Sequence, residues 1–186
     1  MIVIRNTLDF YMDRPTAVCI GKFDGVHIGH KKLLERITAQ KARGMLACVF
    51  TFDPSPEELF TGKAVATLCD RNEKESYLDE LGVDVVIEFP LTFETAATEP
   101  EEFVRNYLID RLNMKYIAAG DDLSFGAGGR GNRELIEKLS TQYNFECDII
   151  EKVMVDGEAV SSSRIRKAYE LGHNEEAYRM LGRTNR

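Results

Sequence analysis

Short apolar runs alternate with helix-period segments along most of the chain, and this alternation constrains the fold more than any other feature. The run at residues 45–52 is almost continuously apolar, as in a strand that helices cover on both faces. It follows a helix expected over about residues 29–43, in which Leu33, Leu34 and Ile37 share one face. Such alternation predicts an α/β protein with a mostly parallel sheet.

The expected elements succeed one another at regular intervals. Strands are predicted at residues 16–23, 45–52, 83–89, 115–119 and 145–150. Helices are predicted at about residues 29–43, 70–81, 98–112, 132–143, 164–171 and 174–181. Asp70 and Glu73 form a reciprocal cap at the second helix, and Pro100 suits the first turn of the third. We therefore expect a Rossmann-like, doubly wound sheet of about five strands with helices on both faces.

Length and composition predict one folded domain over residues 1–186, with a small helical segment from about residue 164. The sequence is 44% hydrophobic and 30% charged, which argues against disorder. The net charge of −7 disfavours binding to duplex DNA or bulk RNA, because such binding relies on many basic phosphate contacts. An acidic protein can still bind a small anion where basic groups and backbone amides converge.

The sequence favours a cytoplasmic protein without membrane contact. The longest clearly apolar run, residues 45–50, is far shorter than a membrane span, and the first residues do not resemble a signal peptide. The four cysteines show no C-x-x-C spacing and are expected to be reduced thiols.

Parallel sheets bind ligands beyond the carboxyl ends of their strands, so the loops after residues 23, 52, 119 and 150 are the candidates. The first loop holds His27 and His30, with Gly25 and Gly29 beside them. Gly29 and His30 would stand at a helix N-terminus, where free amides favour phosphate. A glycine-rich turn with two solvated histidines is the simpler alternative. A structural zinc fits less well, because no cysteine or carboxylate is spaced to complete a tetrahedral set.

The segment Ser161-Ser162-Ser163-Arg164-Ile165-Arg166 is a second candidate anion site. Hydroxyls at a helix N-terminus, followed by arginines in the first turn, suit phosphate oxygens. An ordinary serine cap with surface arginines fits the same residues. The phosphate interpretation is favoured because both segments are expected at one edge of the sheet, where the two histidines and Arg166 would converge.

Two further loops are less specific. Gly126, Gly128 and Gly131 spell G-x-G-x-x-G, but they follow a late strand rather than opening the fold, so a mobile loop over a substrate or a plain surface loop is expected. The aromatics and prolines of residues 50–60 could wall a flat ring, or pack in the core.

Taken together, these segments resemble the FAD synthetase (FMN adenylyltransferase) half of bacterial bifunctional riboflavin kinase/FMN adenylyltransferases. The resemblance rests on Gly21-x-Phe23-Asp24-Gly25-x-His27-x-Gly29-His30, Phe52-x-Pro54-x-Pro56, Phe125-Gly126, Ser161-Ser162-Ser163-Arg164-Ile165-Arg166 and Leu181-Gly182-Arg183. Among these, His27-Ile28-Gly29-His30 matches the His-x-Gly-His signature of the nucleotidyltransferase superfamily. The sequence departs from the family at Ser163, where threonine is usual, and at Leu123, where an aromatic is usual. The riboflavin kinase half is absent from these residues, so no kinase activity is expected from them: the sequence is either part of a longer native chain that carries that domain or a single-function relative.

The resemblance implies transfer of AMP from ATP to FMN, giving FAD and pyrophosphate, with Mg²⁺ held mainly by phosphates and by no protein ligand that we can name. The implied catalytic residues are His27, His30 and Arg166. The implied ATP-binding residues are Gly21, Phe23, Asp24, Gly29, Ser162, Ser163 and Arg164. The implied FMN-binding residues are Pro54, Pro56, Phe60, Asp122 and Phe125.

Three alternatives remain open at this stage. The chain could be an adenylyltransferase for another small phosphate-bearing substrate, such as pantetheine phosphate or a nicotinamide nucleotide. It could be a flavin-nucleotide binding module without catalysis, against which the two histidines and Arg166 argue. A NAD-dependent oxidoreductase would rest on the misplaced glycine pattern alone.

Overall fold

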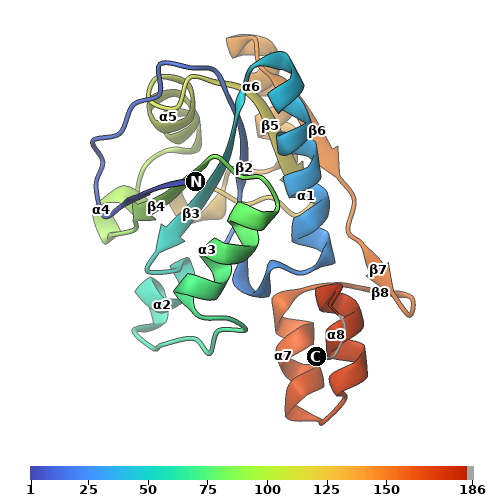
Figure 1. The fold of residues 1–186 in the computed structure, drawn as a ribbon. Coiled ribbons are helices and arrows are strands. Elements are labelled where there is room, and N and C mark those ends of the chain that lie inside the picture. The colour runs from blue at the N-terminus through green and yellow to red at the C-terminus, as the bar shows by residue number, and fades with distance from the viewer. Residues whose placement is uncertain (184–186) are drawn as a thin grey trace.

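A six-stranded parallel sheet forms the centre of the computed structural model, which describes residues 1–183 (Figure 1). The strands are β1 (Ile2–Arg5), β2 (Thr16–Ile20), β3 (Leu46–Asp53), β4 (Val85–Pro90), β5 (Met114–Gly120) and β6 (Glu146–Ile150). Their order is β1-β4-β3-β2-β5-β6. After β2 the chain winds first to one side through β3 and β4, and then to the other through β5 and β6. The predicted doubly wound α/β fold is confirmed.

The sheet has one strand more than the five whose positions were predicted: β1, which pairs with β4 at the edge of the sheet, was missed. This strand is only four residues long, and Ile2 is largely exposed. A short edge strand buries too little apolar surface to leave a clear pattern. The six strands of the sheet and all their pairings are parallel within residues 1–183.

Helices cover both faces of the sheet (Figure 1). The α-helices of the described residues are α1 (Ile28–Ala39), α2 (Pro56–Thr61), α3 (Arg71–Glu80), α4 (Phe93–Ala96), α5 (Pro100–Phe103), α6 (Arg133–Tyr143), α7 (Ser162–Glu170) and α8 (Asn174–Leu181), of which α7 and α8 pack on each other rather than on the sheet. The segment Val104–Ile109 continues α5 as a π-helix. The predicted reciprocal cap of α3 is confirmed, since Asp70 Oδ1 accepts the Glu73 amide at 2.9 Å and Glu73 Oε2 accepts the Asp70 amide at 2.9 Å.

Helix α2 was missed: no helix was predicted between the strand at residues 45–52 and the helix at residues 70–81. The signal was present: Ser55 and Glu58 form a capping box, and Pro56 occupies the first turn. Helix α7 also begins earlier than predicted, at Ser162 rather than Arg164, because the Ser161 hydroxyl is the cap and accepts the Arg164 amide at 3.2 Å.

The near-continuous apolar run of β3 has a simple cause. Phe50 points into the cluster on one face of the sheet, which includes Phe89 and Leu108, whereas its neighbour Val49 points into the cluster on the other face, with Leu34. Successive side chains of a strand alternate between faces, so a strand covered on both sides needs apolar residues at every position.

A third, smaller apolar cluster lies between α7 and α8, which pack together at the C-terminal end of the described chain (Figure 1). A hairpin of β7 (Met154–Val155) and β8 (Glu158–Ala159) precedes them. Its turn residues, Asp156 and Gly157, have φ values of 54° and 82°, as a two-residue hairpin turn requires. Residues 184–186, included in the predicted domain, lie outside the described part. No helix within residues 1–183 is long and apolar enough to cross a membrane.

Candidate active site

The loops after β2 and β5 diverge, because β2 and β5 are neighbours whose following connections run to opposite sides of the sheet. This is the switch point at which doubly wound sheets bind ligands. A cavity of about 440 Å³ opens there, and we call it the larger cavity. It is lined by Ile20, Gly21, Lys22, His27, Gly29, His30, Leu33, Phe52, Pro56, Gly120, Asp122, Leu123, Ser124, Ile150, Glu151, Lys152, Val153, Val160, Ser161 and Ser162.

A tight turn carries the chain from β2 into α1 and places both histidines on the cavity wall. His27 is the cap of α1, and its Nδ1 accepts the backbone amide of His30 at 3.3 Å. Since Nδ1 accepts, the proton of the neutral ring stands on Nε2, which remains a donor. A side chain at Gly29 would put its Cβ 3.1 Å from the His27 ring, so glycine at this position lets the imidazole stand over the helix end.

The two imidazoles stack on each other, with ring centroids 3.6 Å apart and an interplanar angle of 15°. The ring of Phe23 lies beneath them, 4.8 Å from that of His30, and is completely buried. Burial lowers the pKa of His27 from 6.5 to about 4, and burial together with His27 lowers the pKa of His30. Both rings are therefore neutral at pH 7. The Nδ1 atom of His30 is buried and has no hydrogen-bond partner within residues 1–183.

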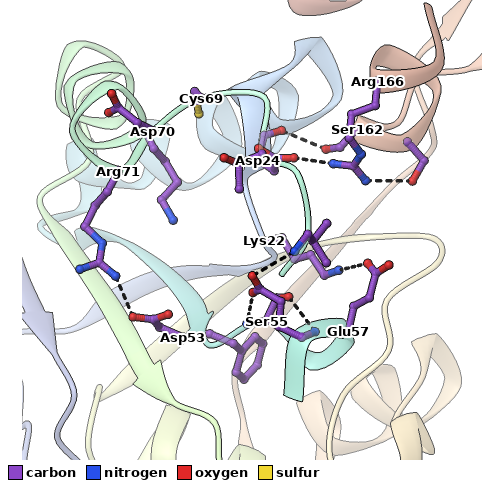
Figure 2. A pocket seen from close by; sticks show the side chains of 16 residues that line it. Lys22, Asp24, Asp53, Ser55, Glu57, Cys69, Asp70, Arg71, Ser162 and Arg166 are labelled. Carbon is purple, nitrogen blue, oxygen red and sulfur yellow. Dashed lines mark hydrogen bonds and ion pairs between the residues drawn. The ribbon is translucent and has the colours of Figure 1, made fainter. Parts of the chain in front are cut away.

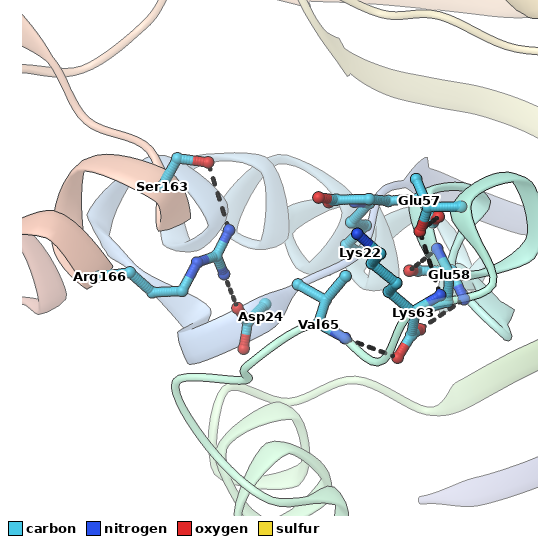
Figure 3. A network of polar contacts seen from close by, with 10 residues as sticks. Lys22, Asp24, Glu57, Glu58, Lys63, Val65, Ser163 and Arg166 are labelled. Carbon is cyan, nitrogen blue, oxygen red and sulfur yellow. Dashed lines mark hydrogen bonds and ion pairs between the residues drawn. The ribbon is translucent and has the colours of Figure 1, made fainter.

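Arg166 lies across from this turn and is held by Asp24, which belongs to the turn itself (Figure 3). Its Nη1 donates to Asp24 Oδ2 at 2.6 Å, and its Nη2 donates to Ser163 Oγ at 3.2 Å. Ser162 Oγ donates to the carbonyl oxygen of Asp24 at 2.9 Å, and the second carboxylate oxygen of Asp24 accepts the Leu68 amide at 2.7 Å. Asp24 thus joins the histidine turn to the start of α7.

These residues line a second cavity of about 360 Å³, which we call the smaller cavity (Figure 2). It is bounded by Lys22, Asp24, Phe52, Asp53, Ser55, Glu57, Glu58, Val65, Thr67, Cys69, Asp70, Arg71, Lys74, Ser162, Ser163 and Arg166. The two cavities share Lys22, Phe52 and Ser162. The histidines and Arg166 therefore face two adjoining cavities, rather than the single cleft that the sequence suggested.

Several residues predicted for the site line the cavities. Those on the larger cavity are Gly21, His27, Gly29, His30, Pro56, Asp122 and Ser162. Those on the smaller cavity are Asp24, Ser162, Ser163 and Arg166. Phe23, Arg164, Pro54, Phe60 and Phe125 line neither cavity. Phe23 instead supports the His30 ring from below.

Arg164, predicted to bind ATP, is occupied elsewhere. Its Nη1 donates to the carbonyl oxygens of Val155 and Glu158 at 3.0 and 2.8 Å, and its Nη2 pairs with Glu176 at 2.6 Å. Residues two positions apart on a helix do not share a face, so Arg164 and Arg166 project to different sides of α7. Arg164 therefore ties the hairpin and α8 to α7.

The two aromatic residues predicted to contact flavin also lie away from the cavities. Phe125 is buried against Phe103, with ring centroids 6.1 Å apart, and a Cβ on Gly131 would lie 2.6 Å from its ring. Phe125 and Gly131 bridge the ends of the glycine-rich loop through two backbone hydrogen bonds. Phe60 is 62% exposed on α2, beside the equally open ring of Phe93.

The residues that α3 and the segment after β6 contribute to the site were not predicted from the sequence. Arg71 and Lys74 of α3 reach the smaller cavity, and Lys152 and Val153 reach the larger one. Lys152 Nζ pairs there with Asp122 at 3.0 Å. Lys74 lies four residues after the cap of α3 and belongs to no motif. Only the tertiary fold brings it to the smaller cavity, so the sequence alone does not indicate a site residue there.

A doubly wound parallel sheet, with a His-x-Gly-His turn opening its first helix at the switch point, defines a nucleotidyltransferase-like α/β protein. The family model described as FAD synthetase matches residues 10–164. The chain belongs to the FAD synthetase family.

Relatives of known name support this placement. The bifunctional riboflavin kinase/FMN adenylyltransferase of Escherichia coli (strain K12) is 38% identical over 151 residues, which are 80% of this chain and 48% of that protein. An FAD synthetase of Listeria monocytogenes is 34% identical over 173 residues, which are 91% of this chain and 69% of that protein. The chain thus spans about half the length of its bifunctional relatives.

Two solved structures share the architecture. A Streptococcus pneumoniae protein described as a macrolide-efflux protein gives a TM-score of 0.84 at 28% identity, over 98% of this chain and 61% of that chain. A pantothenate synthetase from Thermus thermophilus gives a TM-score of 0.51 at 17% identity, over 96% of this chain and 82% of that chain. The second likeness concerns the fold alone.

Proposed function

We propose that this chain transfers AMP from ATP to FMN, giving FAD and pyrophosphate. The observation that carries the proposal is the stacked, neutral His27–His30 pair at the switch point, beside a cavity that holds Arg166 and Asp24. Membership of the FAD synthetase family and the Listeria relative named for this activity support the choice of substrates.

In this reaction an oxygen of the FMN phosphate attacks the α-phosphorus of ATP. The bond between the α-phosphorus and the oxygen that bridges it to the β-phosphorus breaks, and pyrophosphate leaves. The substrate supplies the nucleophile, so the protein contributes positioning and charge stabilisation. The Nε2–H of His27 is a donor for a phosphate oxygen as charge develops there. Because the imidazoles are neutral, they donate hydrogen bonds without attracting a carboxylate into the site.

The remaining roles follow from the two cavities. Ser162, Ser163 and Arg166 bind the departing pyrophosphate portion, and Asp24 orients the Arg166 guanidinium. In the larger cavity, Leu123, Phe52 and Pro56 supply apolar walls for a ring. Asp122, paired with Lys152, is the polar group on that wall.

Magnesium enters as part of the ATP complex. Within residues 1–183 no group of three or more histidine, cysteine, aspartate or glutamate side chains is placed to hold a metal ion. The carboxylate of Asp24, the nearest acid to the histidines in sequence, is already used by Arg166 and the Leu68 amide. In the proposed reaction Mg²⁺ would be held mainly by phosphate oxygens and water.

A single assay tests the proposal. The protein is mixed with ATP, Mg²⁺ and FMN, while flavin fluorescence and released pyrophosphate are followed together. FAD fluoresces less than FMN because its adenine stacks on the flavin, so a fall in fluorescence with equimolar pyrophosphate supports the proposal. The variant His30→Ala serves as the matched control and should abolish most of both signals.

The alternatives give different results in the same assay. Flavin binding without pyrophosphate release would identify a binding module and contradict the proposal. Release of pyrophosphate with pantetheine phosphate or nicotinamide mononucleotide, but not with FMN, would identify an adenylyltransferase for another substrate.

A further inference from the structure

One lysine differs from every other basic residue that lines the two cavities. Lys22 pairs with Glu57 at 3.3 Å, Arg71 with Asp53 at 2.8 Å, Arg166 with Asp24 at 2.6 Å and Lys152 with Asp122 at 3.0 Å. The ammonium group of Lys74 has no hydrogen bond or ion pair with any residue between positions 1 and 183. It is half-buried and lines the smaller cavity from α3.

This difference decides which cation attracts an incoming anion. A guanidinium that already pairs with a carboxylate must share its charge, so the net attraction that it offers a phosphate is small. An unpaired ammonium on a partly buried wall keeps its full charge, and its field is less screened than at an open surface. Lys74 is therefore the main uncompensated positive charge available to a ligand of the smaller cavity.

The start of α7 shows which part of a ligand would reach Lys74. Ser161 and Ser162 line the larger cavity, whereas Ser162, Ser163 and Arg166 line the smaller one. A phosphate chain whose first member lies at His27 and His30 therefore passes Ser162 and continues into the smaller cavity.

We propose that Lys74 binds the β- and γ-phosphates of ATP in the smaller cavity and retains the pyrophosphate after transfer. This inference rests on the proposed function, and it adds a binding residue on α3 that belongs to none of the motifs found in the sequence. The FMN phosphate, which must approach the α-phosphorus from the side opposite the leaving group, stays in the larger cavity.

The acidic side chains of the smaller cavity are compatible with such a ligand. Glu58 and Asp70 accept backbone amides in their capping boxes, and the other three carboxylates pair with the basic residues named above. Lys74 on α3 and Arg166 on α7 both line this cavity, and the surrounding carboxylates favour a magnesium complex of the polyphosphate over the free anion.

Kinetics on Lys74 variants provide the first test. Lys74→Gln should raise the KM for ATP about 10-fold or more and leave the KM for FMN unchanged, and Lys74→Arg should restore most of the loss. Lys138→Gln, on the exposed face of α6, removes the same charge away from both cavities and is the matched control. An unchanged KM for ATP, or a rise in the KM for FMN alone, would overturn the assignment.

The second test uses the unpaired thiol of the same cavity and needs no turnover. Cys69 is half-buried there, and Cys147 is the other half-buried cysteine, so a Cys147→Ser background leaves Cys69 as the main site for a maleimide. Pyrophosphate should slow the labelling of Cys69 severalfold, FMN should not, and Lys74→Gln should remove the protection.

The two tests separate the two hypotheses. If pyrophosphate protects Cys69 but no FAD forms, the proposed function fails and the phosphate subsite stands. If FAD forms but pyrophosphate gives no protection, the proposed function stands and the role of Lys74 is refuted. Should Lys74→Gln fail to fold, labelling of the protein with an intact Lys74 still decides between these outcomes.

Discussion

The turn that carries His27 and His30 and the ion pair of Arg166 with Asp24 face adjoining cavities, but they are stabilised in opposite ways. His27 and His30 are neutral, stacked and supported by the buried ring of Phe23. Arg166 is charged, partly exposed and held by the carboxylate of Asp24. One wall of the site is fixed by packing, and the other by an ion pair.

The difference follows from the cost of burying charge. A neutral imidazole can be placed in a nearly water-free turn without a counter-charge, whereas a guanidinium cannot be neutralised and needs a partner. In the proposed reaction, the packed wall would therefore lie at the reacting centre, where water must be excluded. The ion-paired wall would bind the leaving group, because its partners can exchange as pyrophosphate arrives and departs.

Removing an imidazole tests the packed wall and should have the largest effect. His27→Ala or His30→Ala should lower kcat by roughly 10² to 10³-fold, as expected when a preorganised hydrogen-bond donor to the transition state is lost. Thermal melts alongside turnover assays will show whether the fold is kept. His173→Ala is the control, since that ring is exposed at the start of α8. Near-normal turnover in both site variants would refute the assignment.

Acidification should act on the packed wall. The pKa of His27 is about 4 in the folded protein and near 6.5 in the unfolded chain, which takes up the proton first as the pH falls. Stability should therefore drop between pH 6.5 and pH 4, by up to about 3 kcal/mol from this group, and return as the pH rises. Urea denaturation across this range should show a shallower pH dependence for His27→Gln. Equal slopes for both proteins would contradict the burial argument.

The pH profile of kcat sharpens the same point. Neutral imidazoles predict no loss of turnover between pH 8 and pH 6, where a solvated histidine would become charged. Hydrogen-bond partners also lower the pKa values of three glutamates, Glu58, Glu101 and Glu146. Protonation of these carboxylates reduces the stability of the fold as well, but only below about pH 4.5. A turnover midpoint near pH 6.5 would show that the histidines are solvated.

The ion-paired wall should respond more weakly, and mainly through ATP. Arg166→Ala should raise the KM for ATP severalfold, less than Lys74→Gln, because the Arg166 guanidinium already shares its charge with Asp24. Asp24→Asn should give a smaller rise, because the arginine remains but is no longer oriented. Steady-state kinetics with ATP varied at saturating FMN will measure both. If neither the ATP affinity nor the rate changes in Arg166→Ala, the phosphate role of Arg166 is wrong.

The packed wall, formed by His27 and His30, was easier to predict from the sequence than the ion-paired wall of Arg166 and Asp24. The histidine turn is local, since the cap, the glycine and both rings lie within four residues, and the strand before it fixes its place at the sheet edge. The same locality made the Asp70–Glu73 cap and helix α8 predictable. Strand β1 escaped because a short exposed edge carries little apolar pattern.

The ion-paired wall depends on contacts between distant segments. Asp24 meets Arg166 across 142 positions of sequence, and no spacing rule indicates that Arg166, rather than Arg164, turns toward it. Lys74 lies in an ordinary charged helix until the fold brings α3 to the cavity. Phe60 and Phe125 show the converse: the family resemblance suggested a ligand contact for each, whereas packing places the Phe60 ring at the surface and the Phe125 ring in the core.

The smallest effect should come from Arg183, which ties the C-terminal helices to the turn that both walls share. Its Nη2 donates to the Gly25 carbonyl oxygen at 2.7 Å, and its guanidinium stands 3.7 Å from the centroid of the Tyr77 ring. Arg183→Leu should destabilise the protein by about 1 kcal/mol, through loss of one hydrogen bond and one cation–π contact. Tyr77→Leu removes only the ring contact, and Arg133→Ala breaks an exposed helix-surface pair with Glu137 as a control.

Urea denaturation measures the stability of these variants, and ATP kinetics show which wall the C-terminal helices support. Because Asp24 and Gly25 are adjacent, loosening the Arg183 contact should disturb the ion-paired wall and raise the KM for ATP slightly. The histidines are fixed by their own stacking and by Phe23, so kcat should stay the same. A fall in kcat with an unchanged KM would mean that the packed wall also depends on the C-terminal helices, and the contrast between the two walls would not hold.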